Sequence, residues 1–415
     1  MSFEWPVVSI EDVCELIVDC VNKTAPVVQM ATPYRMIRTT NVRDGRINLS
    51  ECRFVERDTY EKWTRRARLC PGDVVLTREA PIGEVGIVTE AEGVFLGQRL
   101  MQYRANKDFL DARFLHYTFL SPSLQQQFGS HEGSGSVVSH IRVGDCFKFK
   151  LSLPPLAIQR GISTLLGALD DRITLLRETN ATLEAIAQAL FKSWFVDFDP
   201  VRAKMEGRSP EGMGEATAAL FPDGVEESEL GLVPRGWRVA RLDEFMELAY
   251  GKALKATDRV AGDVPVYGSG GITGYHNESL VNGPSVIIGR KGTVGSLYWE
   301  DQPFFAIDTV FYLRTTTPLT YCFYLLQTLG LAGMNTDAAV PGLNRNNVYR
   351  LTVPYAPANV LQAFDDVVSV IRQRIFSNSQ QAQTLATLRD TLLPRLISGA
   401  LRLPEVTVKL EESAA

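Results

Sequence analysis

The sequence predicts an α/β protein in which two α/β domains in tandem duplication are separated by two long antiparallel coiled-coil helices with pseudo-twofold symmetry. Three observations indicate this fold class: an apolar heptad pattern over residues 155–198, a second copy of that pattern over residues 355–400, and similar strand and turn patterns before each helix. Internal repeats of this kind reveal the architecture directly. We therefore expect the order domain, helix, linker, domain, helix.

The long helices are predicted from apolar residues spaced alternately by three and four, as in coiled-coil seams. The first seam contains Leu166, Leu169, Ile173, Leu176, Leu183, Ala187, Leu190 and Trp194, and the second, offset by 202 residues, contains Val368, Ile371, Ile375, Leu385, Leu388 and Leu392. Each helix would be about 60 Å long at about 1.5 Å per residue. Asn180 and Asn378 fall on the seams, where a polar residue fixes register. Each helix is expected to bury the other's seam; two core helices of one globular domain are the alternative.

The domains are predicted over residues 1–154 and 235–354 because the two segments share local patterns. A short strand and an acidic helix start are expected after both Trp5 and Trp237. Residues 74–83 and 286–295, offset by 212, both have the β-branched run, arginine, turn and glycine of a hairpin. Each copy continues with a strand, a short helix and a Leu-x-x-Pro segment that leads into its long helix, at residues 151–154 and 351–354.

Two further segments are expected to lie outside the domains and helices. Residues 199–234 are rich in Gly, Pro and Glu, which is typical of an exposed acidic linker, and residues 401–415 form a C-terminal tail. The net charge of −5 arises mainly here, because residues 155–234 carry 7 basic and 13 acidic side chains. The acidic balance therefore does not exclude DNA binding by the two nearly neutral domains.

The sequence predicts a cytoplasmic protein. It has no apolar run long enough for a membrane span, and its N-terminus lacks the basic and apolar regions of a secretory signal. The six cysteines are scattered without a CxxC pair, so neither a disulfide framework nor a zinc site is expected.

No catalytic or metal-binding constellation is predicted. The four histidines are dispersed, and no HExxH, GxSxG or P-loop pattern occurs. The glycine cluster at residues 267–271 lacks the following helix and the downstream lysine of a nucleotide loop. We interpret it as a loop whose bare backbone approaches a binding partner, because glycine has no Cβ to prevent close approach.

Basic side chains interleaved with aromatic and amide groups predict surfaces that contact phosphates and read base edges in both domains. Solvated polar loops are the alternative for any single residue. Some of these arginines are expected to pair with Glu51, Glu56, Glu61 or Glu79 instead. The candidate DNA-binding residues are Arg35, Arg38, Arg65, Arg66, Arg78, Gln98, Arg99, His140 and Arg142 in the first domain, and Lys252, Lys255, Tyr267, Ser269, Gly270, Gly271, Tyr275, Arg290, Lys291, Asn344 and Arg345 in the second.

Four segments give the chain a resemblance to the specificity subunits of type I restriction-modification systems. Two lie in the second domain, at Tyr267-Gly-Ser-Gly-Gly-Ile272 and at residues 287–295, and two lie at the helix ends, at residues 183–198 and 388–399. The resemblance spans nearly the full chain. Domain one departs from the commoner pattern, because it has Arg78-Glu-Ala-Pro81 where domain two has Arg290-Lys-Gly-Thr293.

The resemblance implies two target-recognition domains, each reading one half of a split site on double-stranded DNA. It also implies that the helices set the gap and dock two methyltransferase subunits, and that restriction subunits join the complex. The chain itself would be non-catalytic and without cofactors, with S-adenosylmethionine, ATP and Mg²⁺ in the partner subunits. The candidate partner-interface residues are Leu169, Ile173, Leu183, Leu190, Phe191, Trp194, Phe195, Leu385, Leu392 and Leu396.

Two other functions are compatible with the residues alone. The first is a non-catalytic scaffold that pairs two partner proteins through its helices and binds peptide or carbohydrate with its α/β domains. The second is an enzyme with an unrecognised site. Strong salt dependence of DNA binding, as counterion release demands, would distinguish the DNA-binding function from the scaffold.

Overall fold

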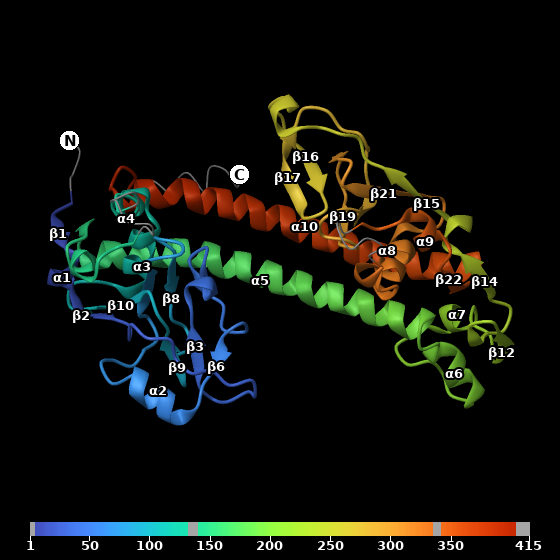
Figure 1. Ribbon diagram of the computed structural model, residues 1–415, viewed down its shortest axis with the longest axis horizontal. Helices are drawn as coiled ribbons and strands as arrows, with labels where there is room; N and C mark the ends of the chain where they lie inside the picture. The colour runs from blue at the N-terminus through green and yellow to red at the C-terminus, as the bar shows by residue number, and fades with distance from the viewer. Residues whose placement is uncertain (1–4, 132–139, 335–341, 404–415) are drawn as a thin grey trace. The chain divides into compact units, whose positions relative to one another are not determined.

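The computed structural model describes residues 5–131, 140–334 and 342–403, so most of the predicted tail at 401–415 lies outside the described residues. The chain forms two compact units. Unit 1 comprises Met1–Leu175 and Gln381–Ala415, and unit 2 comprises Leu176–Gln380. Each unit contains one α/β domain and one end of each long helix, drawn in green and red in Figure 1.

Domain 1, in unit 1, is built on a four-stranded antiparallel sheet and a smaller three-stranded sheet. The larger sheet has the order β2 (Cys14–Asp19), β10 (Leu100–Ala105), β7 (Val74–Thr77), β8 (Val85–Ile87). The smaller has the order β6 (Arg53–Phe54), β3 (Arg35–Ile37), β9 (Val94–Leu96). Two strand pairs complete it, β1 (Val7–Ser9) with β11 (Lys150–Ser152) and β4 (Val42–Arg43) with β5 (Arg46–Ile47). Its helices are α1 (Ile10–Val13), α2 (Arg57–Trp63), α3 (Ala112–Leu120) and α4 (Pro122–Gly129).

Domain 2, in unit 2, has the same plan. Its four-stranded sheet has the order β15 (Met246–Tyr250), β21 (Val310–Thr315), β18 (Ser285–Gly289), β19 (Leu297–Glu300). The smaller sheet has the order β17 (Gly271–His276), β16 (Val264–Gly268), β20 (Phe305–Ala306), and β14 (Arg238–Arg241) pairs with β22 (Thr352–Tyr355). Its helices are α8 (Leu319–Thr328) and α9 (Arg345–Tyr349).

Strand pairing confirms the predicted duplication. In each large sheet the neighbours are antiparallel, and in each small sheet the central strand has one antiparallel and one parallel neighbour. The register agrees as well, because Leu100 pairs with Thr77 in domain 1 and Val310 pairs with Gly289 in domain 2. The hairpins expected at residues 74–83 and 286–295 are β7–β8 and β18–β19. Equivalent positions of the two domains can therefore be compared residue by residue.

The long helices are α5 (Leu156–Phe195) and α10 (Ala358–Ile397), each of 40 residues. Unit 2 shows that they are antiparallel, because Asn180 meets Asn378 while Phe191, further along α5, meets Phe364, which is earlier in α10. The predicted seam asparagines face each other, with Asn378 Nδ2 donating to Asn180 Oδ1 at 2.9 Å. No helix in the described part of the chain has an apolar stretch long enough to cross a membrane.

Residues 199–234 differ from the exposed linker that the sequence predicts. They form α6 (Asp199–Met205), α7 (Glu215–Ala218) and a hairpin of β12 (Val225–Ser228) and β13 (Gly231–Pro234). Val201, Phe221 and Val233 are buried, and Val201 and Phe221 join the hydrophobic core of unit 2. The apolar side chains between the glycines and prolines provide the reason, since burying each stabilises the fold by about 1.5–3 kcal/mol.

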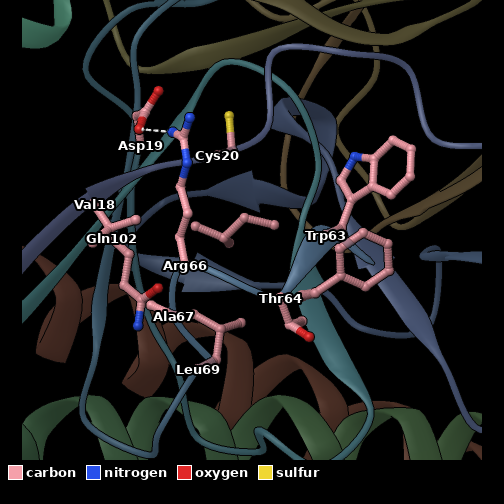
Figure 2. Close-up of a pocket in the computed structure, with 11 residues that line it drawn as sticks. Val18, Asp19, Cys20, Trp63, Thr64, Arg66, Ala67, Leu69 and Gln102 are labelled. Atoms are coloured by element: carbon pink, nitrogen blue, oxygen red, sulfur yellow. Dashed lines mark hydrogen bonds and ion pairs between the residues drawn. The ribbon is translucent and has the colours of Figure 1, made fainter. Parts of the chain in front are cut away.

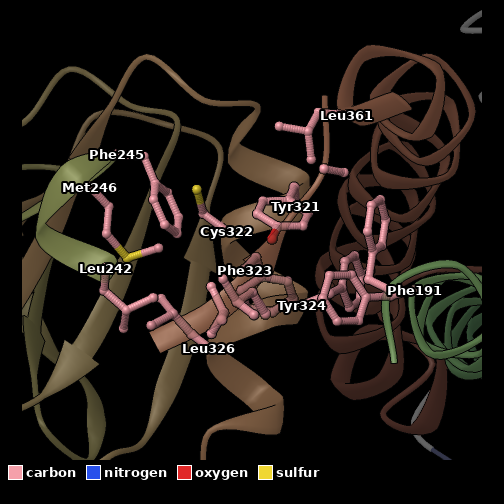
Figure 3. Packing of buried hydrophobic residues seen from close by; sticks show 14 of the residues in the cluster. Phe191, Leu242, Phe245, Met246, Tyr321, Cys322, Phe323, Tyr324, Leu326 and Leu361 are labelled. Atoms are coloured by element: carbon pink, nitrogen blue, oxygen red, sulfur yellow. The ribbon is translucent and has the colours of Figure 1, made fainter. Parts of the chain in front are cut away.

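The seams of the long helices are continuous with the domain cores. Figure 3 shows this in unit 2, where Phe191 of α5 and Leu361 of α10 face Tyr321 and Tyr324 of α8. In unit 1, Leu166 of α5 and Leu396 of α10 belong to the cluster that contains Phe114 of α3. Each domain therefore packs on the helix pair through its own short helix.

A carboxylate on α5 links the two long helices to the domain in each unit. In unit 2, Glu184 accepts hydrogen bonds from Arg372 of α10 at 2.9 Å and from the Tyr324 hydroxyl at 3.2 Å. In unit 1, Asp170 accepts from Arg389 of α10 and from the Tyr117 hydroxyl, both at 2.7 Å. Both acids thus lie on α5 and both arginines on α10. This arrangement favours the pairing of α5 with α10.

A double-mutant cycle on Glu184 and Arg372 tests this link. Arg372 is 11% exposed and also stacks on Trp299 at 4.6 Å, so the pair is poorly screened by solvent. We expect Glu184→Ala and Arg372→Ala to show a coupling free energy of about 1–2 kcal/mol in denaturant unfolding. The exposed pair Arg208 and Glu206 is the control and should show less than about 0.5 kcal/mol. Equal coupling in the two cycles would contradict the proposed role.

Candidate nucleic-acid interface

Three loops of domain 2 that are distant in sequence meet at one place. They are the turn between β16 and β17, the tip between β18 and β19, and the segment before α9. Ser296 Oγ donates to the Ser269 carbonyl at 2.6 Å, which joins the tip to the turn, and Leu343 N donates to the Arg290 carbonyl at 2.8 Å, which joins the tip to the segment before α9. The structure therefore brings together the candidates Ser269, Arg290 and Asn344.

Glycines make these turns possible. Gly271 and Gly295 have φ values of +102° and +73°, a region that other residues rarely adopt. A Cβ on Gly289 would collide with the Thr293 carbonyl oxygen. The cluster at residues 267–271 thus spans the hairpin turn between β16 and β17, and a strand follows it. Gly270 is exposed at this turn.

The candidate lysines of domain 2 are exposed, whereas its candidate arginines are held in place by contacts with other residues. Lys252, Lys255 and Lys291 are exposed. The Arg290 guanidinium lies 4.9 Å from the Tyr250 ring centroid and donates to the Asp308 carbonyl at 3.1 Å. The Arg345 guanidinium lies 4.8 Å from the same centroid and donates to the Leu248 carbonyl at 3.5 Å.

The aromatic candidates of domain 2 differ in accessibility. Tyr275 on β17 is exposed. Tyr267 is buried, and its hydroxyl donates to Glu300 at 2.7 Å. Burial, together with the neighbouring Glu300, raises the pKa of Tyr267, so it stays a neutral donor at physiological pH. Its ring lines the base of the turn, whereas Tyr275 is accessible to a ligand.

In domain 1 three of the seven candidate arginines are paired with acids. Arg35 pairs with Glu90, Arg66 with Asp19, and Arg99 with Glu79 at 3.0 Å. Pairing of an arginine with Glu79 was predicted from the sequence, whereas the pairs with Glu90 and Asp19 were not. Ion pairs at exposed positions contribute only about 0–1 kcal/mol, so a DNA phosphate can compete for these guanidiniums.

Arg78 occupies the position equivalent to Arg290 but has a different environment. It is only 8% exposed, and its Nη1 donates to the Ile141 carbonyl at 2.9 Å. Ile141 N in turn donates to the Arg78 carbonyl at 3.0 Å. This arginine therefore holds the segment that contains His140 and Arg142 against the hairpin tip, and in this conformation it is not available to a ligand.

Three other candidates of domain 1 line a shallow depression of about 280 Å³, namely Arg38, Gln98 and Arg99. Arg53, Thr24 and Thr39 share its wall, and its apolar part is formed by Ala25, Val27 and Met36. Arg53 could not be predicted from the sequence, because its two-residue strand carries no signal that would place it beside Gln98. Arg65 is separate from this group, exposed after α2, with its Nε donating to the Lys62 carbonyl at 3.3 Å.

A second pocket of domain 1 surrounds the pair formed by Arg66 and Asp19 (Figure 2). Trp63, Cys20 and Gln102 also line it, and its volume is about 20 Å³. That is room for about one water molecule, which needs about 10–15 Å³, and not for a nucleotide. Arg66 and Asp19 therefore cover a packed region.

Cysteine reactivity depends on the pKa of the thiol, and metal binding depends on the grouping of His, Cys, Asp and Glu side chains. Burial raises the pKa of the Cys146 thiol to about 11 and that of Cys322 to about 12, which leaves both protonated at neutral pH. Within the described ranges, no three or more His, Cys, Asp or Glu residues form a group that could hold a metal ion.

The predicted partner-interface residues lie mainly inside this chain. Leu392 and Leu396 are buried in the core of unit 1, and Phe191, Trp194 and Phe195 are buried in that of unit 2. Ile173 is fully buried, and the remaining four are half-buried: Leu169, Leu183, Leu190 and Leu385. Because the seams bury each other, a separate protein would have to contact the outward faces of the helices.

Two copies of one α/β unit, each with basic and amide side chains on its loops and each packed on a pair of long helices, define a duplicated binding protein. The chain belongs to the family described as the type I restriction modification DNA specificity domain, which matches residues 3–185 and 234–360.

Individual relatives agree with this assignment. The MjaIX specificity subunit of a type I restriction enzyme from Methanocaldococcus jannaschii is 24% identical over 383 residues, covering 85% of this chain and 83% of the relative. The HindI specificity subunit from Haemophilus influenzae is 25% identical over 379 residues, covering 75% and 82%. The crystal structure of a type I S subunit from M. genitalium has the same fold, with a TM-score of 0.58 and 18% identity, covering 95% of this chain and 96% of that one.

The pH dependence of stability can be predicted for one buried histidine of unit 1. His116 of α3 donates from Nε2 to the Gly45 carbonyl at 2.8 Å, and burial lowers its pKa to about 4. Between pH 6.5 and 4 the unfolded chain binds a proton that the folded chain does not, so stability falls as the pH falls through this range. The loss is on the order of 3 kcal/mol. The free energy of unfolding in denaturant, measured between pH 6.5 and 4, should show this loss for the wild type and not for His116→Gln. An equal pH dependence of the two proteins would contradict the prediction.

Proposed function

We propose that this chain is the DNA-specificity subunit of a type I restriction-modification complex, in which each α/β domain reads one half of a bipartite site. The duplication carries the proposal: one strand topology occurs twice with the same register, and each copy carries basic side chains on its loops. Two similar readers on one chain suit a site with two separated halves. The family and the names of the relatives support the same function.

The long helices would set the gap between the half-sites. Each has 40 residues, which corresponds to about 60 Å at about 1.5 Å per residue. A helical turn of B-DNA is about 34 Å, so half-sites separated by one to two turns are within the reach of such a spacer. Direct readout would use arginine and amide groups on the loops, which can bind guanine and adenine bidentately in the major groove.

Catalysis would belong to partner subunits. Two methyltransferase subunits would use S-adenosylmethionine, and restriction subunits would use ATP and Mg²⁺, in the cytoplasm where the DNA is accessible. The methyltransferase subunits would dock on the outward faces of the helices, because the seams are buried. Ile186 on α5 and Val367 and Val370 on α10 are exposed apolar side chains of this kind in unit 2.

Mapping of methylated bases tests the proposal. The full chain is coexpressed with its methyltransferase partner, and modified bases are located across the host DNA. We expect one bipartite sequence whose halves are separated by a fixed gap, and binding that weakens steeply with salt as counterion release requires. A single contiguous site, or binding that does not depend on salt, would contradict the proposal.

A domain exchange gives a sharper expectation. Replacing residues 1–154 by the first domain of another member of the family should change one half of the methylated sequence and leave the other half unchanged, because domain 2 makes its own contacts. The same mapping experiment measures the outcome. Replacing residues 235–354 is the matched control and should change the opposite half. A change in both halves after either exchange would show that the domains do not read independently.

A further inference from the structure

Two arginines of domain 2 share one aromatic ring. The guanidinium carbons of Arg290 and Arg345 lie 4.9 Å and 4.8 Å from the centroid of Tyr250, so the two charges are at most about 10 Å apart. The ring itself rests on Phe311, with a centroid distance of 5.0 Å. Tyr250 lies at the end of β15 and is 47% exposed, so this cluster faces solvent.

The cluster is not required by the fold, because domain 1 forms the same sheet without it. Tyr250 pairs with Phe311 across β15 and β21, as Asp19 pairs with Met101 across β2 and β10. The position of Tyr250 is therefore occupied by Asp19 in domain 1. The two long helices are related by an offset of 202 residues, and the same offset places Val143 at the position of Arg345. Arg78 lies at the position of Arg290 and is buried. Only domain 2 combines an exposed ring with two partly exposed cations here.

The charges of the cluster are not neutralised within the part of the chain that the structure describes. No carboxylate there forms an ion pair with Arg290, Lys291 or Arg345, whereas Arg35, Arg66 and Arg99 of domain 1 all have acidic partners. Arg290 and Arg345 each use one nitrogen on a backbone carbonyl. The Nε of Arg345 is buried without a hydrogen-bond partner in the described residues. Two like charges at this separation repel each other, and an anion between them would remove that cost.

We infer that Tyr250 is a positioning residue that holds Arg290 and Arg345 ready for the DNA half-site read by domain 2. The inference rests on the proposed function and names the groups that contact the DNA. A free arginine loses about 2 kcal/mol of rotamer entropy when a ligand fixes it. An aromatic face that orients the guanidinium beforehand reduces that loss at binding. The ligand would be a phosphate or the O6 and N7 edge of guanine, since both accept two hydrogen bonds from one guanidinium.

Methylation kinetics test the inference in the full complex. After the target has been mapped for the wild type, kcat/KM is measured on duplexes with the intact target and with single substitutions in each half. Arg290→Ala and Arg345→Ala should lower kcat/KM about tenfold or more and identify the half read by domain 2, because a bidentate contact contributes about 1–3 kcal/mol. Tyr250→Leu should lower it by a similar factor and weaken discrimination in that same half. Tyr250→Phe, which keeps the ring, should stay within about twofold of wild type.

Three controls separate positioning from general damage. Discrimination in the other half should be unchanged in every variant, which shows that the complex is intact. Arg345→Val introduces the residue that domain 1 has at the equivalent position, which the shared backbone accommodates there. Arg238→Ala removes an arginine that stacks on Tyr355 at 4.7 Å and pairs with Glu244, and it should leave both halves unchanged.

The failure of the inference differs from the failure of the proposed function. If the wild-type complex methylates a bipartite site and Tyr250→Leu keeps discrimination in both halves, the positioning role is wrong while the function stands. Equal losses in Tyr250→Phe and Tyr250→Leu would also overturn it, because the ring alone is inferred to hold the arginines. If the wild-type complex methylates no bipartite site, the proposed function fails and the inference fails with it.

Discussion

The mutual burial of two heptad seams is the interaction on which the rest of this structure depends. Most of the stability of helices in proteins comes from packing of an apolar face, so each 40-residue helix depends on burial of its apolar stripe. Here the stripe of α5 packs against α10 and, in each unit, extends into the core of the domain. Phe191 and Phe364 lie in the same cluster as Tyr321, and Leu166 and Leu396 in the same cluster as Phe114. Each domain is thus fixed to the helix pair by apolar packing.

Polar groups then select one arrangement of the helices from those that apolar packing allows. Asn180 and Asn378 bond to each other at 2.9 Å, and a shift in register would leave the buried amide of Asn378 without this partner. The acids of α5 and the arginines of α10 add direction, because pairing two copies of α5 would separate Asp170 and Glu184 from Arg389 and Arg372. The tyrosine hydroxyls on α3 and α8 accompany these pairs, so helix register and domain attachment are specified by the same side chains.

Most of the architecture could be predicted because it depends on periodic sequence patterns, and each pattern occurs twice in the chain. Heptads located α5 and α10 to within three residues at each end, and the repeated hairpins located β7–β8 and β18–β19. The segment 199–234 was predicted wrongly because its glycines and prolines conceal Val201 and Phe221, whose burial depends on tertiary contacts. Arg78 and Arg290 align in sequence, but nothing local indicates that one is buried. Tyr250 was missed because a strand-end aromatic shows its role only when the loops that meet it are in place.

Divergence between the two domains explains how one fold can supply two different readers. Strand order and register are the same in both copies, so the backbone presents the same loop positions twice. The side chains at those positions differ in charge and in how firmly they are held: domain 1 pairs Arg35, Arg66 and Arg99 with acids, and domain 2 stacks two arginines on Tyr250. In the proposed complex, the paired arginines would have to exchange a protein carboxylate for a DNA group, whereas the stacked arginines would need no such exchange. The net charge of −5 is compatible with both, because recognition is decided by local charge at the loops and much of the acidic excess lies elsewhere in the chain.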